Sequence, residues 1–157
     1  MTAIPYYHIG ILVPDLDEAV ERFSDVLGVT FADRVYQDSQ HFDDGGVLRD
    51  LRLHLTYSID GPPYYELIEA QGDEGLYSIK HGAGLHHVGI WEPDPTAKRE
   101  EYYAKGMTHE ATIYRPDGSI IVTFFDPEPL GGVRIEFANL DLKEGHESWL
   151  TGGDFVR

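Results

Sequence analysis

The sequence contains no cysteine, which excludes disulfide bonds, thiolate metal sites and thiol catalysis. It is also poor in positive charge, with 12 Lys and Arg against 28 Asp and Glu and a formal net charge of −16. Such a chain repels nucleic acid and anionic membrane surfaces, so neither is an expected partner. It has no apolar run long enough to span a membrane and no signal-peptide pattern at its N-terminus. We therefore expect a cytoplasmic protein whose metal sites, if it has any, use His, Asp or Glu.

The chain has 157 residues, of which 41% are hydrophobic. That length is typical of one domain and is long enough to bury a core. We therefore expect residues 1–157 to form a single domain.

A short phrase occurs twice, about half a chain apart. Residues 7–11 read YHIGI and residues 86–90 read HHVGI, and each copy is followed within a few residues by Pro-Asp. A self-similar phrase at this spacing predicts two repeated structural units.

Each copy leads into a predicted helix. In the first, Asp15 or Asp17 is a candidate N-cap and Gly28 a candidate end. In the second, Asp94 can cap, Pro95 suits the first helical position and Gly106 ends the helix. The repeated phrase therefore reads as a strand followed by a helix in both units.

Three further strands are predicted after each helix, which makes each unit βαβββ and the fold α+β. The predicted strands cover residues 29–36, 50–57, 64–70, 110–114, 119–125 and 133–138. The polar segments 37–46 and 71–84 are predicted loops. Unit one is then about 4–70, the linker about 71–84, unit two about 85–140 and the C-terminal tail 141–157, with a last helix in 141–150.

Four of these strands each carry a His or Glu in the middle: His8, Glu66, His87 and Glu136. A single buried His is usually a hydrogen-bonded core residue, and a single strand Glu is usually solvated. Four such residues in two equivalent pairs, on faces expected to be enclosed, point to a shared cation instead. Two imidazoles and two carboxylates suit Zn, Mn, Fe, Co or Ni. His86 competes with His87, but the period-two pattern and the alignment with His8 favour His87.

The repeated unit and two local phrases resemble the vicinal oxygen chelate superfamily, the glyoxalase/bleomycin resistance/dioxygenase group. Residues 84–89 (GLHHVG) and 131–137 (GGVRIEF) are similar to its methylmalonyl-CoA epimerase branch, which is related to glyoxalase I. The resemblance implies a curved mixed sheet around a metal-binding cavity and often a homodimer. It implies one divalent metal ion, with Zn, Ni, Co or Mn ahead of Fe, held by the same four residues.

The resemblance also implies a metal-dependent isomerase, epimerase or lyase acting on a small carbonyl or acid substrate. The metal polarises the carbonyl, and a carboxylate, Glu136 or Glu66, moves the proton at the neighbouring carbon. His54 alternates with Leu53 and Leu55, which look like residues facing the helices, so we expect His54 to face the cavity and to act as an acid, a base or an orienting group. Further candidates to grip an aromatic or acidic substrate are Tyr64, Trp91, Tyr114 and Arg134.

Other functions of the same fold remain as alternatives. The epimerase branch has a His-Pro-Lys phrase where residues 126–129 here read Asp-Pro-Glu-Pro, which argues against a CoA substrate. The lack of an arginine cluster leaves glutathione unsupported. An iron ring-cleaving dioxygenase uses two His and one Glu, so Glu66 as a fourth ligand argues against it. A drug-binding resistance protein commonly lacks the ligands, so the full set argues against that alternative.

Overall fold

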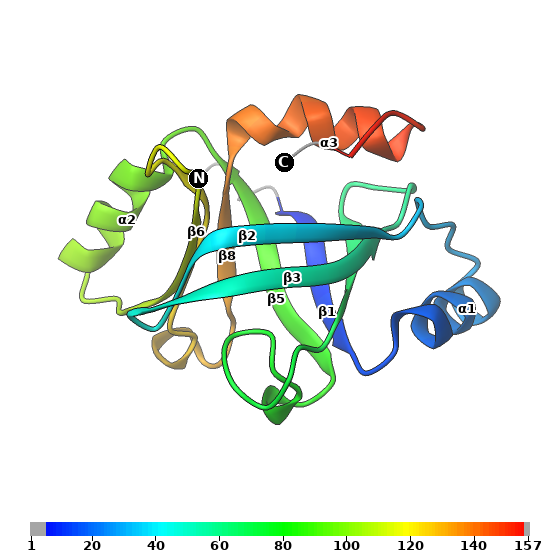
Figure 1. The fold of residues 1–157 in the computed structure, drawn as a ribbon, viewed down its shortest axis with the longest axis horizontal. Helices are drawn as coiled ribbons and strands as arrows, with labels where there is room; N and C mark the ends of the chain where they lie inside the picture. Colours follow the sequence, from blue (N-terminus) through cyan, green and yellow to red (C-terminus); the bar gives the residue numbers. More distant parts are fainter. Residues whose placement is uncertain (1–5, 156–157) are drawn as a thin grey trace.

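A computed structural model describes residues 6–155 as eight strands, three α-helices and three short 3-10 helices (Figure 1). The first residues of the expected first unit and the last two of the tail lie outside the described residues. The strands are β1 (Tyr6–Val13), β2 (Val35–Asp44), β3 (Val47–Tyr57), β4 (Tyr64–Glu69), β5 (Gly84–Glu92), β6 (His109–Tyr114), β7 (Ile120–Phe125) and β8 (Ile135–Asn139). The helices are α1 (Leu16–Leu27), α2 (Pro95–Ala104), α3 (Lys143–Leu150), η1 (Ile79–His81), η2 (Glu128–Leu130) and η3 (Leu140–Leu142).

The element order confirms the predicted α+β class with two βαβββ units. The strands form one closed barrel in the order β1-β4-β3-β2-β6-β7-β8-β5. At its centre β1 pairs antiparallel with β5, and each pairs in parallel with the last strand of its own unit, β4 or β8. On the opposite side the barrel closes through a short ladder in which Phe42–Asp44 pair with Ala111–Ile113. The first strands of the two units are therefore neighbours, and the last strand of each unit lies beside the first strand of the same unit.

Both repeat helices begin after a predicted aspartate, and α1 ends at the predicted Gly28, whereas α2 ends at Ala104 with Lys105 as its C-cap, just before the predicted Gly106. The Asp15 side chain accepts a 2.8 Å hydrogen bond from the Glu18 amide, and Gly28 ends α1 at φ 69°. In α2, the Asp94 side chain accepts from the Ala97 amide at 2.9 Å. Each side-chain cap satisfies one of the free amides of a helix N-terminus. The two helices lie at opposite sides of the barrel in Figure 1.

The main core is inside the barrel, and smaller clusters lie between the barrel and the helices. Val13 and Leu67 of the barrel pack with Leu16 of α1, while Ile90, Phe125 and Phe137 pack against Tyr102 of α2. The interior cluster draws side chains from all around the barrel, including Leu12, Phe42, Leu51, Leu53, Leu55, Tyr57, Ile68, Ile113, Val122 and Phe124. The interior is thus mainly a packed apolar core, which a few buried polar side chains enter, among them those of His8, Glu66, His87 and Glu136.

The second strand of the first unit differs from the prediction. The predicted strand 29–36 and loop 37–46 are wrong, because β2 begins at Val35 and runs to Asp44. Only Gln37 and Phe42 of this strand are buried, so its sequence is polar although it pairs with β3 along its length. A hydropathy pattern does not detect a strand that buries so few side chains.

Two segments cover the barrel interior at opposite ends (Figure 1). The helix α3 confirms the predicted helix of the tail and buries Trp149 and Leu150 in the interior cluster. The segment between β4 and β5, which contains η1, buries Leu76 and Tyr77 in the same cluster. Among the helices of residues 6–155, none has the length and hydropathy required to span a bilayer.

Candidate metal centre

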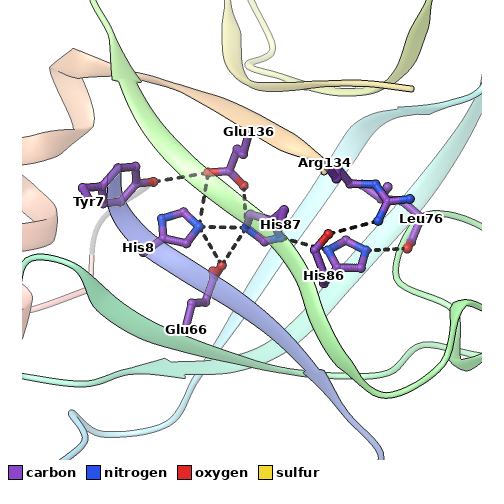
Figure 2. A network of polar contacts seen from close by, with 8 residues as sticks. All are labelled: Tyr7, His8, Glu66, Leu76, His86, His87, Arg134 and Glu136. Carbon is purple, nitrogen blue, oxygen red and sulfur yellow. Dashed lines mark hydrogen bonds and ion pairs between the residues drawn. The ribbon is translucent and has the colours of Figure 1, made fainter. Parts of the chain in front are cut away.

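Four neighbouring strands bring together the side chains of His8, Glu66, His87 and Glu136, which point toward one another inside the barrel (Figure 2). Each offers one ligand atom, and these atoms all lie within 4.8 Å of one another. Their exposed fractions are only 0–3%. The structure therefore places the four residues singled out by the repeat at one buried point.

The distances between the ligand atoms of the cluster are those expected for groups that bind one common ion. The Nε2 atoms of His8 and His87 are 2.7 Å apart, and each is 3.1 Å from Glu66 Oε2. Glu136 is more loosely placed, with its oxygens 3.4 Å from His87 Nε2 and 4.0 Å from His8 Nε2. Ligands bound at 2.0–2.2 Å to one ion lie about 3 Å from each other. The cluster thus has the size of a single-ion site.

The glycine of each repeated phrase makes room for the histidine of the other. A Cβ added to Gly10 would lie 2.1 Å from His87 Cε1, and one added to Gly89 would lie 2.1 Å from His8 Cε1. The β1–β5 register pairs Gly10 with His87 and His8 with Gly89, so each ring lies over the opposite glycine. The His-x-Gly spacing of both phrases follows from this reciprocal packing.

Charge in the cluster is dominated by Glu66. Burial alone raises the pKa of this carboxyl, but its electrostatic interaction with His8 and His87 outweighs burial, and the pKa lies well below its ordinary value. Glu66 is therefore an anion at neutral pH, and Glu136 adds a second carboxylate to the same enclosed space. Enclosed carboxylates need a compensating positive charge.

A divalent cation fits this set of donors. Glu66 Oε2 is buried and has no hydrogen-bond donor among the described residues, although it lies against both imidazoles. An oxygen in that position, two Nε2 atoms and a second carboxylate form the N₂O₂ set that suits a first-row divalent metal. The four side chains are therefore chemically and geometrically able to hold one.

His86 fixes the orientation of the His87 ring. His86 Nε2 lies 2.9 Å from the Leu76 carbonyl, which only accepts, so this nitrogen carries a hydrogen. Burial, followed by the charges of His87 and Arg134, lowers the pKa of His86 to about 3, so the ring is neutral. Its Nδ1 then accepts from His87 Nδ1 at 2.8 Å, which leaves the lone pair of His87 on Nε2, inside the cluster. This is the arrangement that a metal-binding imidazole requires.

Arg134 stabilises the same region from β8's side of the barrel. Its guanidinium donates to the His86 carbonyl at 3.1 Å and forms a two-point ion pair with Glu110 at 2.7 and 2.9 Å. The guanidinium of Arg134, which the sequence suggested as a substrate contact, is therefore already paired with Glu110. Tyr114, another such candidate, accepts from Arg99 of α2 at 2.8 Å.

Two residues support the site in roles that were not predicted from the sequence: Tyr7 had no predicted role, and His86 was only the competing choice to His87 as a ligand. The Tyr7 hydroxyl donates to Glu136 Oε1 at 3.2 Å, and His86 holds His87. Tyr7 and His86 each precede a ligand histidine at the same position of the repeated phrase. This shared position is the sequence signal from which both could have been predicted. Tyr7 and His86 are repeat equivalents that support different ligands.

The predicted position of His54 is wrong. Leu53 and Leu55 face the barrel interior rather than the helices, so His54 lies on the outer face of β3. There its ring stacks on Tyr36, and its Nδ1 lies 3.5 Å from a carboxylate oxygen of Glu69. His54 therefore lies beside Glu69 on the outside of the barrel and is not part of the four-residue cluster.

Comparison with known proteins gives a family match and fold relatives. The sequence profile of the Glyoxalase/Bleomycin resistance protein/Dioxygenase superfamily matches residues 7–124. Among curated proteins, none matches the chain.

The fold is similar to solved methylmalonyl-CoA epimerases. A variant of the Streptomyces coelicolor enzyme in complex with 2-nitronate-propionyl-CoA is 23% identical, with a TM-score of 0.63 over 88% of this chain and 95% of that chain. The enzyme from Mycobacterium tuberculosis is 22% identical, with a TM-score of 0.60 over 88% and 91%. A hypothetical protein from Bacillus halodurans is 22% identical, with a TM-score of 0.63 over 85% and 92%. These similarities establish a shared fold.

Proposed function

The chain belongs to the Glyoxalase/Bleomycin resistance protein/Dioxygenase superfamily, and from this premise we propose that it is a metal-dependent isomerase, epimerase or lyase. The reaction moves a proton at the carbon next to a carbonyl of a small organic substrate. The observation that carries the proposal is the buried cluster of two imidazoles and two carboxylates, drawn symmetrically from the two repeated units. A bound Zn, Ni, Co or Mn ion supplies a Lewis acid that stabilises the negative charge developing on the carbonyl oxygen.

The two carboxylates are suited to different tasks. Glu66 Oε2 lies 3.1 Å from both imidazoles, and its lowered pKa makes it a weak base. Glu136 lies farther from both imidazoles and accepts a hydrogen bond from the Tyr7 hydroxyl. We assign Glu66 to holding the ion and Glu136 to taking and returning the proton, with Tyr7 orienting the carboxylate.

The substrate that we propose is a small carbonyl compound or acid. Several of the epimerase neighbours are complexes with CoA compounds, such as 2-nitronate-propionyl-CoA and methylmalonyl-CoA. In this chain, Asp126 and Glu128 stand where the epimerase branch has its His-Pro-Lys phrase, and η2 ends at exposed Leu130. With a net charge of −16, an acidic surface at this position disfavours a carrier that bears phosphates.

Deuterium exchange in D₂O tests the proposal. We expect the zinc-, nickel-, cobalt- or manganese-loaded protein to exchange the hydrogen next to the carbonyl of small 2-keto or 2-methyl acids, as followed by proton NMR. Glu136→Gln should slow the exchange at least about 100-fold, because Gln can bind the metal but cannot take a proton. Glu66→Gln should remain within about tenfold of the parent at saturating metal. Full turnover in both variants excludes the proposed roles, and oxygen uptake with iron bound favours a dioxygenase.

A further inference from the structure

Next to the metal centre, four aromatic side chains from four strands surround the ring of His146, a residue of α3. The ring centroid of His146 lies 4.5 Å from that of Tyr57, 5.7 Å from Tyr64, and 5.8 Å from both Tyr7 and Trp91. All four contacts are edge-to-face, with interplanar angles of 70–84°. We call the space within these four walls the aromatic chamber.

The chamber directly adjoins the candidate metal ligands. Its wall residue Tyr7 donates to Glu136, and the Tyr57 ring lies 5.4 Å from the His8 ring. Tyr7 is itself stacked on Trp91 at 3.8 Å, which gives the chamber a flat, rigid side. A group held here would therefore be next to a carbonyl bound at the cluster.

The chamber has the size and shape of a flat ring, as its occupation by the imidazole of His146 shows. Its walls are π-faces and edges, and none of the four carries a positive charge to attract an anion. Edge-to-face packing on several walls is the favoured environment of a neutral aromatic or heteroaromatic group. The imidazole of His146 is such a group, and the polypeptide holds it there through α3.

A substrate can reach the cluster only if one of its covers moves, since the four ligands are at most 3% exposed. The cover between β4 and β5 is tied to the barrel, for example by the Leu76 carbonyl to His86 and by an ion pair from Glu74 to Arg49. The other cover, α3, has eight residues and buries three side chains on one face, His146, Trp149 and Leu150. An eight-residue helix held by one buried face is an element expected to open at low free energy.

From these observations we propose that the aromatic chamber is the binding pocket for a flat aromatic or heteroaromatic group of the substrate, and that His146 fills it until the substrate displaces α3. The proposal rests on the proposed function in one respect, that the substrate also carries oxygens for the metal. It narrows the substrate to a carbonyl acid that carries a flat ring as well as a hydrogen on the carbon next to the carbonyl. In this account Tyr57, Tyr64 and Trp91 determine specificity, and α3 is the lid.

The pocket can be tested without metal. In EDTA-treated protein, His146→Ala should empty the chamber, and free imidazole should then bind and change the fluorescence of the two tryptophans, Trp91 and Trp149. Glu144→Ala, an exposed change on the same helix, is the matched control. We expect imidazole to bind His146→Ala at least about tenfold more tightly than the parent or the control. A folded His146→Ala protein with no saturable imidazole binding overturns the proposal.

A second measurement uses the unaltered protein and applies even if His146→Ala does not fold. Zinc-loaded protein is titrated with phenylglyoxylate and with pyruvate, which share the same two oxygens and differ in the ring. We expect phenylglyoxylate to bind at least about tenfold more tightly and to speed amide exchange in residues 143–150. Equal affinities, or unchanged exchange in α3, contradict the proposal. If metal-free His146→Ala binds imidazole but neither the parent nor the variant binds metal, the aromatic chamber is a pocket and the proposed function is rejected. If the protein binds metal but folded His146→Ala does not bind imidazole, the proposed function stands and the pocket is rejected.

Discussion

Replacing Gly89 with alanine places a methyl group in the volume of the His8 ring. The new Cβ would lie 2.1 Å from His8 Cε1 and 2.3 Å from Nδ1. Carbon atoms in contact prefer about 3.5 Å, so the ring, or strand β1 with it, must retreat by about 1.4 Å. Metal–ligand distances tolerate a change of about 0.2 Å, so His8 can no longer bind together with the other three ligands.

We expect Gly89→Ala to weaken metal binding about 100-fold, or about 2.7 kcal/mol. Overpacking of this kind also lowers the free energy of unfolding by about 1–3 kcal/mol. Isothermal titration with zinc measures the first quantity and urea unfolding the second. Gly10→Ala, whose Cβ meets His87, should behave in the same way because the packing is reciprocal.

Gly106→Ala is the matched control for these two changes. Gly106 has φ 79°, and a Cβ there meets nothing within 4 Å. Alanine in that conformation is destabilising by about 1–2 kcal/mol but leaves the cluster untouched. The reasoning is refuted if Gly89→Ala binds zinc as tightly as the Gly106→Ala control.

Two further predictions concern the groups around the cluster. His86→Ala removes the acceptor for His87 Nδ1, so zinc affinity should fall about 10–100-fold by titration, whereas the exposed His41→Ala should leave it unchanged; equal affinities would show that His86 does not orient the ligand. The lowered pKa of Glu66 means that its ionised form stabilises metal-free protein above its ordinary pKa of about 4.3, and that this stability is lost as the pH falls through the folded-state value. Glu66→Gln should therefore make the stability of metal-free protein less dependent on pH in that acidic range, as measured by urea unfolding at several pH values, and an unchanged dependence contradicts the assignment.

The sequence was sufficient to predict the repeat, the helix ends and the fold class because each depends on local chemistry. Asp15 and Gly28 act within one turn of α1, and their effect does not depend on the rest of the chain. The alternation along β1 and β5 likewise selects the side of the strand on which His8 and His87 lie. His8 and His87 could be proposed because the same phrase marks the first strand of both units, and Glu66 and Glu136 because each lies in the middle of a last strand.

The errors came from strands whose surroundings depend on the closed barrel. Alternation on β3 separates Leu53 and Leu55 from His54, but it does not say which set faces inward. The barrel encloses the leucines, and so His54 lies outside. The polar strand β2 escaped prediction because it closes the barrel with few buried side chains. The contacts of His86 with Leu76, and of His146 with the aromatic chamber, join distant segments and leave no local pattern.

The central claim is that His8, Glu66, His87 and Glu136 together hold one divalent metal ion. Elemental analysis of the purified protein, and of protein reloaded with metal and desalted, tests it most directly. We predict about one equivalent of Zn, Ni, Co or Mn per chain, and a large loss of metal in each of the four ligand-to-alanine variants that remains folded by circular dichroism. No bound metal after reloading, or full occupancy in a folded variant that lacks one of the four side chains, contradicts the account.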